Sequence, residues 1–202
     1  SDTQVKEALA QADVILITVG EHDFMDEFLV TADNFRQEFQ FEKFHDVFSA
    51  QLADYGFTDE NELLPYSNAM ASAIRLNQDA AGENIQKINA ELANYPNAKI
   101  IYQTAYNLLD NLHDYSTLSS KRQMTYNGIM NPAKTALNKY LNDYITQFAE
   151  EHENCILIDT YTGFAGNAYQ YTRLYELNLN PTAAGHAWMA DTIIKESGLS
   201  RM

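Results

Sequence analysis

Three short runs of β-branched and other apolar residues predict buried strands. The first covers 13–20 and closes on a glycine, the second covers 98–104 after the turn-forming Tyr95-Pro96-Asn97, and the third covers 155–159. A continuous apolar run is typical of a strand buried on both faces, as in parallel sheets. We therefore expect a parallel sheet in which the first strand is covered on both sides.

Apolar residues at helical spacing lie between these runs. Asn131 and Pro132 predict the N-cap and first position of a crossover helix, whose apolar stripe is Leu137, Leu141, Tyr144 and Phe148. A stripe before the second strand has Gly82 as a predicted weak point and comprises Ile74, Ala81, Ile85, Ile88 and Leu92. A last helix is expected to start near Pro181-Thr182 and to bury some of Trp188, Met189 and Ile193. Alternating strands and helices predict a layered α/β fold with right-handed crossovers.

Most phenylalanines of the chain fall in the segment 24–66, namely Phe24, Phe28, Phe35, Phe39, Phe41, Phe44, Phe48 and Phe57. Their four-residue spacing favours one or two amphipathic helices that pack on the domain. The alternative is a lid or an acyl-binding wall beside a site at the end of the first strand. We expect one domain, 1–202, in which 24–66 is a helical insertion or lid-like segment.

Composition narrows the classes of partner. The 202 residues are 46% hydrophobic and 20% charged, which indicates one folded domain with a full core. Lys and Arg number 13 against 28 Asp and Glu, and the resulting net charge of -15 disfavours nucleic acid and anionic membranes. No apolar run approaches a membrane span, and the stretch from Ser1 to Ala10 is polar and acidic rather than signal-like. Cys155, as the one cysteine, has no internal disulfide partner.

Four segments, in order, resemble the SGNH (GDSL) hydrolases. Residues 12–23 resemble the family's third block, in which a strand runs into Gly-x-Asn-Asp, and 91–101 resemble the helix that enters its fourth strand. Residues 138–159 are similar to the next helix and fifth strand, and 180–186 resemble the tail of Asp-x-x-His-Pro-x-x-x-Gly-His. The resemblance implies a three-layer αβα, flavodoxin-like parallel sheet without the family's first two strands. It also implies lipase or esterase chemistry on acyl esters.

The chain departs from this family at its catalytic positions. The resemblance implies a serine in an N-terminal Gly-Asp-Ser block, an Asp-x-x-His base and an oxyanion-hole asparagine. Here the serine block has no counterpart, Asn180 and Leu177 occupy the base and aspartate positions, and His22 follows Gly20-Glu21 where the asparagine is expected. Because an amide does not accept a proton near neutral pH, we expect this chain to be inactive alone. Gly20, His22 and Asn180 are therefore candidate catalytic positions whose family roles are in question.

Two interpretations of the substitutions stay open. His22 and Asn180 either decayed to polar residues at a former cleft, or they exchanged roles, so that His22 is the base and Asn180 an oxyanion donor. The exchange still needs a serine and an acid to orient the imidazole. Asp23 is a candidate for substrate binding, as are Tyr106 and Asn107, which follow the second strand where sites of α/β proteins gather.

Other polar residues predict no chemistry. His186 is expected to cap or pack the last helix, and isolated His45, His113 and His152 predict no zinc site. Ser116, Ser119 and Ser120 are interpreted as loop serines because they lack a Gly-x-Ser-x-Gly elbow. We expect neither a metal nor a cofactor.

The missing strands predict an exposed edge at 14–19, because the family's strand order is 2-1-3-4-5. We expect one of three covers for this edge: a separate N-terminal chain, a symmetry mate in a dimer, or the Phe-rich segment. The expected ligand is a small acyl ester or a glycan. The alternative function is a non-catalytic binding or interaction domain for a glycan or a protein partner, and a third reading is an unrelated flavodoxin-like domain. The resemblance and the low cysteine content favour a bacterial extracellular or cell-surface location, and the cytoplasm stays open.

Overall fold

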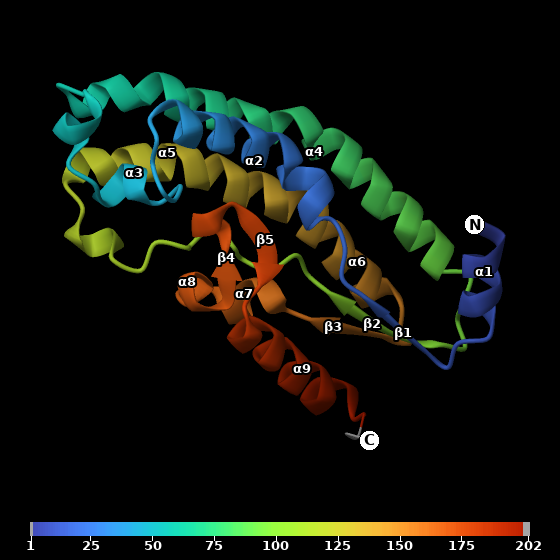
Figure 1. Ribbon diagram of the computed structural model, residues 1–202. Coiled ribbons are helices and arrows are strands. Elements are labelled where there is room, and N and C mark those ends of the chain that lie inside the picture. Colours follow the sequence, from blue (N-terminus) through green and yellow to red (C-terminus); the bar gives the residue numbers. More distant parts are fainter. Residues whose placement is uncertain (1, 200–202) are drawn as a thin grey trace.

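Three parallel strands form the central sheet, in the order β1-β2-β3 (Figure 1). The computed structural model describes residues 2–199, so Ser1 of the predicted polar N-terminus lies outside the described residues. Strands β1 (Val14–Ile17), β2 (Lys99–Gln103) and β3 (Cys155–Ile158) coincide with the three apolar runs. The prediction of three contiguous parallel strands is confirmed, and the chain is an α/β protein.

Helices cover the two faces of this sheet unequally. Helices α4 and α6 lie on one face and α9 lies on the other, beside β3 (Figure 1). The α-helices are α1 (Asp2–Ala10), α2 (Glu21–Glu38), α3 (Asp46–Ser49), α4 (Leu64–Leu92), α5 (Ser120–Leu137), α6 (Asp143–Glu151), α7 (Thr160–Phe164), α8 (Ala168–Tyr171) and α9 (Ala183–Ser197). Single turns and a short hairpin complete the chain: η1 (Leu52–Tyr55), η2 (Glu60–Leu63), η3 (Tyr115–Thr117), η4 (Asn138–Asn142), η5 (Leu174–Glu176), β4 (Thr172–Arg173) and β5 (Asn178–Pro181).

Helix α4 is a continuous helix of 29 residues, so the predicted weak point at Gly82 does not divide it. A Cβ at Gly82 would lie 3.3 Å from the backbone oxygen of Tyr140 and from the ring of Tyr144. The glycine therefore serves close packing against the π-helical turn η4 and helix α6. The apolar stripe is confirmed, since Ile74, Ala81, Ile85 and Leu92 are buried.

The start of helix α5 was predicted wrongly. The helix begins at Ser120, with Pro132 inside it rather than at its first position. Ser119 is the N-cap and its hydroxyl accepts the backbone N–H of Arg122 at 3.2 Å, so this serine is no ordinary loop residue. The apolar stripe continues upstream of the proline through Tyr126, Ile129 and Met130. Burial of these residues, and of Ala133 just after the proline, holds the helix together across Pro132.

The Phe-rich segment packs as core. Helix α2 lies along α4, and Phe28 meets Phe44 edge to face with ring centroids 5.9 Å apart. Phe35 stacks on Tyr66 at 4.3 Å. Phe24, Phe28, Phe41 and Phe48 are each no more than 2% exposed. Most phenylalanines of this segment are therefore part of the hydrophobic core.

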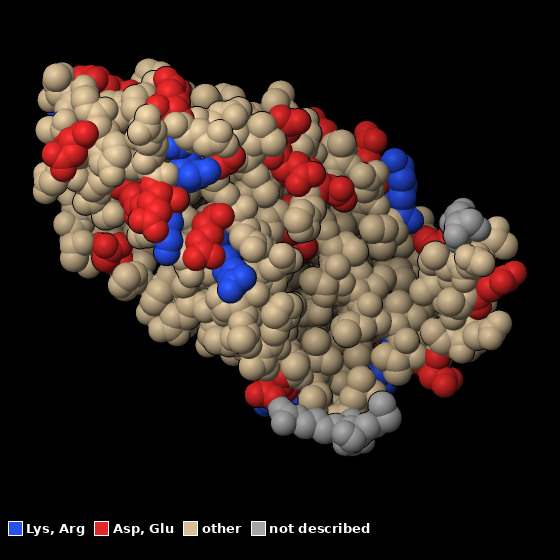
Figure 2. Space-filling view, in the orientation of Figure 1, with Lys and Arg blue, Asp and Glu red and all other residues tan. Residues whose placement is uncertain are grey.

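Strand β1 is not buried on both faces, contrary to the sequence prediction. Val14 is 38% and Leu16 is 54% exposed, whereas Ile101, the partner of Leu16 in the ladder, is fully buried. Helix α9 approaches β3 and leaves β1 open, and a largely uncharged surface extends over this region (Figure 2). Among residues 2–199, β2 is the single strand that pairs with β1. The Phe-rich segment packs on α4 and α5 instead, so that proposed cover is wrong.

The last helix begins where the sequence predicts. Thr182 caps α9 through its hydroxyl, which accepts the N–H of Gly185 at 3.1 Å. Met189 is buried, and Trp188 packs edge to face on Phe164 at 5.4 Å. Within the described residues, no helix has the length and hydrophobicity needed to cross a membrane.

Candidate functional site

The residues of the Gly-x-Asn-Asp position open helix α2 directly after β1. Gly20 is the N-cap with φ 107°, a left-handed conformation that glycine adopts readily. His22 and Asp23 are exposed on the first turn. The imidazole Nδ1 of His22 lies 3.7 Å from the Asp26 carboxylate, one turn further along the helix. This pair faces solvent.

Asn180 lies in strand β5 and is exposed. Its backbone N–H donates to the Asn178 side chain at 2.9 Å, and Leu177 has a left-handed conformation with φ 54°. No hydrogen bond or ion pair between the described residues joins His22 to Asn180. His22 and Asn180 therefore make no direct polar contact with each other in the described part of the chain.

Tyr106 and Asn107 follow β2 and are buried, at 5% and 1% exposed. The Tyr106 hydroxyl donates to the Leu179 carbonyl, which ties this loop to strand β5. The Asn107 side chain accepts the N–H of Asp110 at 3.2 Å and donates to its carboxylate at 2.6 Å. Both residues shape the loop, and Asn107 orients the carboxylate of Asp110.

Glu21 is a buried acid that no motif in the sequence singles out. Its side chain is at the start of α2, only 6% of the residue is exposed, and Oε1 has no hydrogen-bond partner among the described residues. Burial raises the pKa of this carboxyl to about 7, although backbone hydrogen bonds from Glu21 and Tyr106 favour the charged form. A carboxyl with this pKa is protonated in a substantial fraction of molecules at neutral pH.

An open cleft of about 340 Å³ lies where the chain leaves the carboxyl ends of β2 and β3. Its size falls in the range of small-molecule sites, and the carboxyl ends of parallel strands are where α/β proteins place them. The loop after β2, helix α5 and the segment after β3 all contribute. The lining residues are Asp110, Leu112, His113, Tyr115, Tyr126, Asn127, Lys134, Gly166 and Tyr169.

The cleft combines a neutralised charge pair with aromatic rings. Lys134 forms an ion pair with Asp110, so neither charge is left uncompensated. The rings of His113 and Tyr169 lie 4.8 Å apart at 30°, and Tyr115 lies 5.8 Å from Tyr126. The rings give the cleft flat apolar faces beside polar atoms at fixed positions. The Asp110–Lys134 pair adds no net charge to it.

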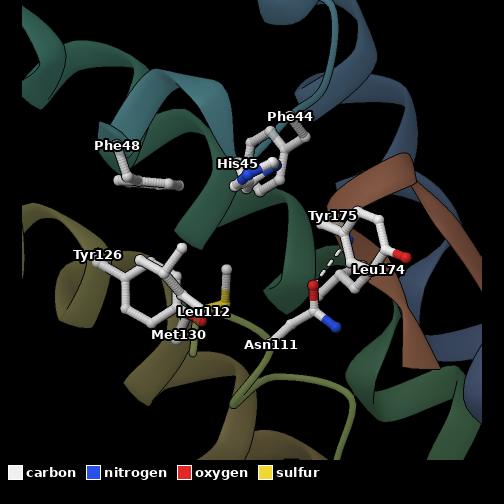
Figure 3. Close-up of a pocket in the computed structure, with 9 residues that line it drawn as sticks. All are labelled: Phe44, His45, Phe48, Asn111, Leu112, Tyr126, Met130, Leu174 and Tyr175. Carbon is white, nitrogen blue, oxygen red and sulfur yellow. Dashed lines mark hydrogen bonds between the residues drawn. The ribbon is translucent and has the colours of Figure 1, made fainter. Parts of the chain in front are cut away.

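A second, smaller hollow adjoins the cleft (Figure 3). Leu112 and Tyr126 line both. The remaining residues of this apolar cavity come from α3 and the turn before it, the loop after β2, α5 and η5, and they are Phe44, His45, Phe48, Asn111, Met130, Leu174 and Tyr175. Two phenylalanines of the Phe-rich segment therefore form part of a wall.

The sequence pattern predicts one loop of the cleft but not the residues that line it. Tyr106 and Asn107 were singled out after β2, and the cleft residue Asp110 follows three positions later. The sequence feature that could have identified Asp110 is the Asn-x-x-Asp spacing. In such a turn the asparagine side chain accepts the backbone N–H groups two and three residues later, here those of Leu109 and Asp110. Gly166 and Tyr169 line the cleft from the segment that follows β3.

Within residues 2–199 no serine hydroxyl or cysteine thiol hydrogen-bonds to a histidine. Ser119 Oγ donates to the Glu60 carboxylate at 3.0 Å, and Ser67 Oγ donates to the Thr125 carbonyl at 3.4 Å. Burial raises the pKa of the Cys155 thiol to about 11, which disfavours the reactive thiolate. The same residues contain no group of three or more His, Cys, Asp or Glu side chains arranged to hold a metal ion.

Comparison with known proteins finds no match to a family model, to a curated protein or to a solved structure.

Proposed function

We propose that this chain is a non-catalytic binding domain with an SGNH-hydrolase-like architecture, and that it binds a neutral glycan in the cleft. The cleft itself carries the proposal: tyrosine and histidine rings lie beside the compensated Asp110–Lys134 pair at the carboxyl ends of the strands. Sugar rings present apolar C–H faces and many hydroxyls, so they suit aromatic faces flanked by hydrogen-bonding groups. An unpaired charge on the ligand has no partner here.

Charge over the whole chain supports a neutral ligand. The net charge of -15 repels polyanions, and acidic side chains outnumber basic ones on the face seen in Figure 2. Asn127 donates to the Tyr115 hydroxyl at 2.7 Å, which fixes both side chains in the wall of the cleft. A site whose polar groups are held in this way loses little entropy on binding.

Calorimetric titration of the chain with cellobiose tests the proposal. We expect heat of binding that is abolished in Tyr169→Ala and largely kept in Tyr169→Phe, because the ring supplies the stacking face. His186→Ala, an exposed histidine on α9, is the control for loss of a surface side chain. Full binding by Tyr169→Ala would sink the proposal, and so would a lack of binding by both cellobiose and its acetamido counterpart N,N′-diacetylchitobiose.

A second candidate, ester hydrolysis, is favoured by the open outer edge of β1. In an SGNH-like arrangement, that edge is where a strand bearing the Gly-Asp-Ser serine would pair, supplied by a separate chain. Incubation of this chain with p-nitrophenyl acetate and a fluorophosphonate label tests whether it hydrolyses esters by itself. We expect neither turnover nor labelling of this chain; labelling at one of its serines would establish it as an enzyme.

A further inference from the structure

The apolar cavity lies directly beside the cleft, because the two hollows share part of their lining. Leu112 and Tyr126 line both. The Tyr126 hydroxyl donates to the Leu109 carbonyl at 2.9 Å, so the tyrosine ring that lines both hollows is held in place. A ligand seated in the cleft therefore lies within the width of one side chain of the cavity.

The size and lining of the cavity select a methyl-sized group. The free space measures about 10 Å³, close to the minimum for one water molecule. Its walls are almost wholly carbon, with Phe44, Phe48 and Met130 each no more than 3% exposed. Water needs two or more polar partners in such a space, whereas a methyl group needs none. An apolar substituent of one carbon suits these walls better than water does.

One polar atom at the rim is left without a hydrogen bond. His45 Nδ1 is buried and has no such partner in the described part of the chain, although the Asp46 carboxylate lies 3.4 Å away. Asn111, which also lines the cavity, is fully used: it accepts the N–H of Tyr175 at 2.8 Å and donates to Ala168 and Thr172. Figure 3 shows His45 and Asn111 on opposite sides of the hollow. The rim therefore offers a histidine nitrogen next to a methyl-sized space.

We propose that the two hollows together bind a neutral saccharide that carries an acetamido group. The sugar ring lies in the cleft, the acetamido methyl enters the apolar cavity, and His45 hydrogen-bonds to the amide beside it. The assignment rests on the proposed glycan-binding function and adds the substituent that the ligand carries. An unsubstituted sugar leaves both the cavity and His45 unused.

Two disaccharides with the same rings and the same β-1,4 linkage test the substituent directly. We expect N,N′-diacetylchitobiose to bind about tenfold more tightly than cellobiose in calorimetric titrations of the full chain, or about 1.4 kcal/mol. Burial of one methyl group and one hydrogen bond to a histidine together reach this size. Equal affinities would overturn the acetamido assignment and leave the glycan-binding function standing. Absence of binding by both sugars would overturn both.

Variants place the methyl group in the cavity. Met130→Phe fills the cavity from α5, and we expect it to bring the ratio of the two affinities close to one. His45→Ala, at the half-exposed rim, should lower the same ratio without repacking the core, and serves if Met130→Phe unfolds the chain. His186→Ala should keep the tenfold ratio. A ratio that stays at tenfold in folded Met130→Phe, or in His45→Ala, would show that the acetamido group binds elsewhere.

Discussion

Glu21→Gln should be increasingly more stable than the native chain as the pH rises. The native carboxyl is buried at the start of α2 with one unpartnered oxygen, and burial raises its pKa from 4.5 to about 7. The folded state therefore holds a proton that the unfolded state releases between these pH values. The stability contributed by this proton is fully present below pH 4.5 and is lost as the pH rises through 7. Glutamine has the same shape and no proton to lose.

The size of the effect follows from the two pKa values. Raising the pKa from 4.5 to about 7 corresponds to roughly 3 kcal/mol, at 1.36 kcal/mol for each tenfold change in proton affinity. We expect the difference in unfolding free energy between Glu21→Gln and the native chain to grow by about 3 kcal/mol between pH 4 and pH 8, in favour of the variant. The other acids titrate alike in both proteins, so they cancel from this difference.

Urea unfolding followed by circular dichroism at pH 4, 5, 6, 7 and 8 measures this difference. Urea is preferred to guanidinium because it leaves the ionic strength unchanged. Glu27→Gln, an exposed acid on the same helix, is the matched control and should give a difference that hardly changes with pH. A flat difference for Glu21→Gln, or one that falls toward pH 8, would refute the reasoning, since the backbone donors would then fully solvate the buried carboxylate.

Three further substitutions test the fold. Leu16→Lys, on the exposed edge, should change the unfolding free energy by less than about 0.5 kcal/mol. It should also lower light scattering at high protein concentration, because an edge lysine blocks strand pairing between molecules. Unchanged scattering would argue against self-association through this edge. Gly163→Ala should lower the unfolding free energy measured in urea by about 1–3 kcal/mol, since the new Cβ would lie 1.9 Å from the Trp188 ring. Helix propensity alone predicts a more stable variant, and that result would contradict the packing. Ser119→Ala should cost about 1 kcal/mol by loss of the α5 cap, and an unchanged thermal midpoint would show the cap to be dispensable.

The strands could be predicted because their cause is local. Unbroken β-branched runs such as 14–17 have few alternatives to a strand, and their order followed from the resemblance. The exposure of Leu16 could not be predicted, because it depends on where α9 crosses the sheet. The Asn131-Pro132 signal failed because a stronger cap at Ser119 and burial of Ile129 and Met130 extend the helix upstream.

The site was harder to predict than the fold. Cleft residues such as Tyr115 and Tyr169 come from separate loops, and their meeting depends on tertiary structure. The burial of Glu21 could not be predicted for a different reason, since an acid at the start of a helix is usually exposed to solvent. The backbone of Tyr106, in the loop after β2, lies within hydrogen-bonding reach of this carboxyl, a contact between segments far apart in the sequence.

Helix α4 has a consequence for how the chain unfolds. One end of this continuous helix carries Tyr66, which stacks on the Phe-rich core, and the other end buries Ile85 and Leu92 beside the sheet layer. Loss of either half therefore exposes apolar surface on the same rigid rod, and the remaining half loses support. The helix couples the two packing regions into one cooperative unit, so calorimetry should show a single heat-absorption peak whose van't Hoff and measured enthalpies agree.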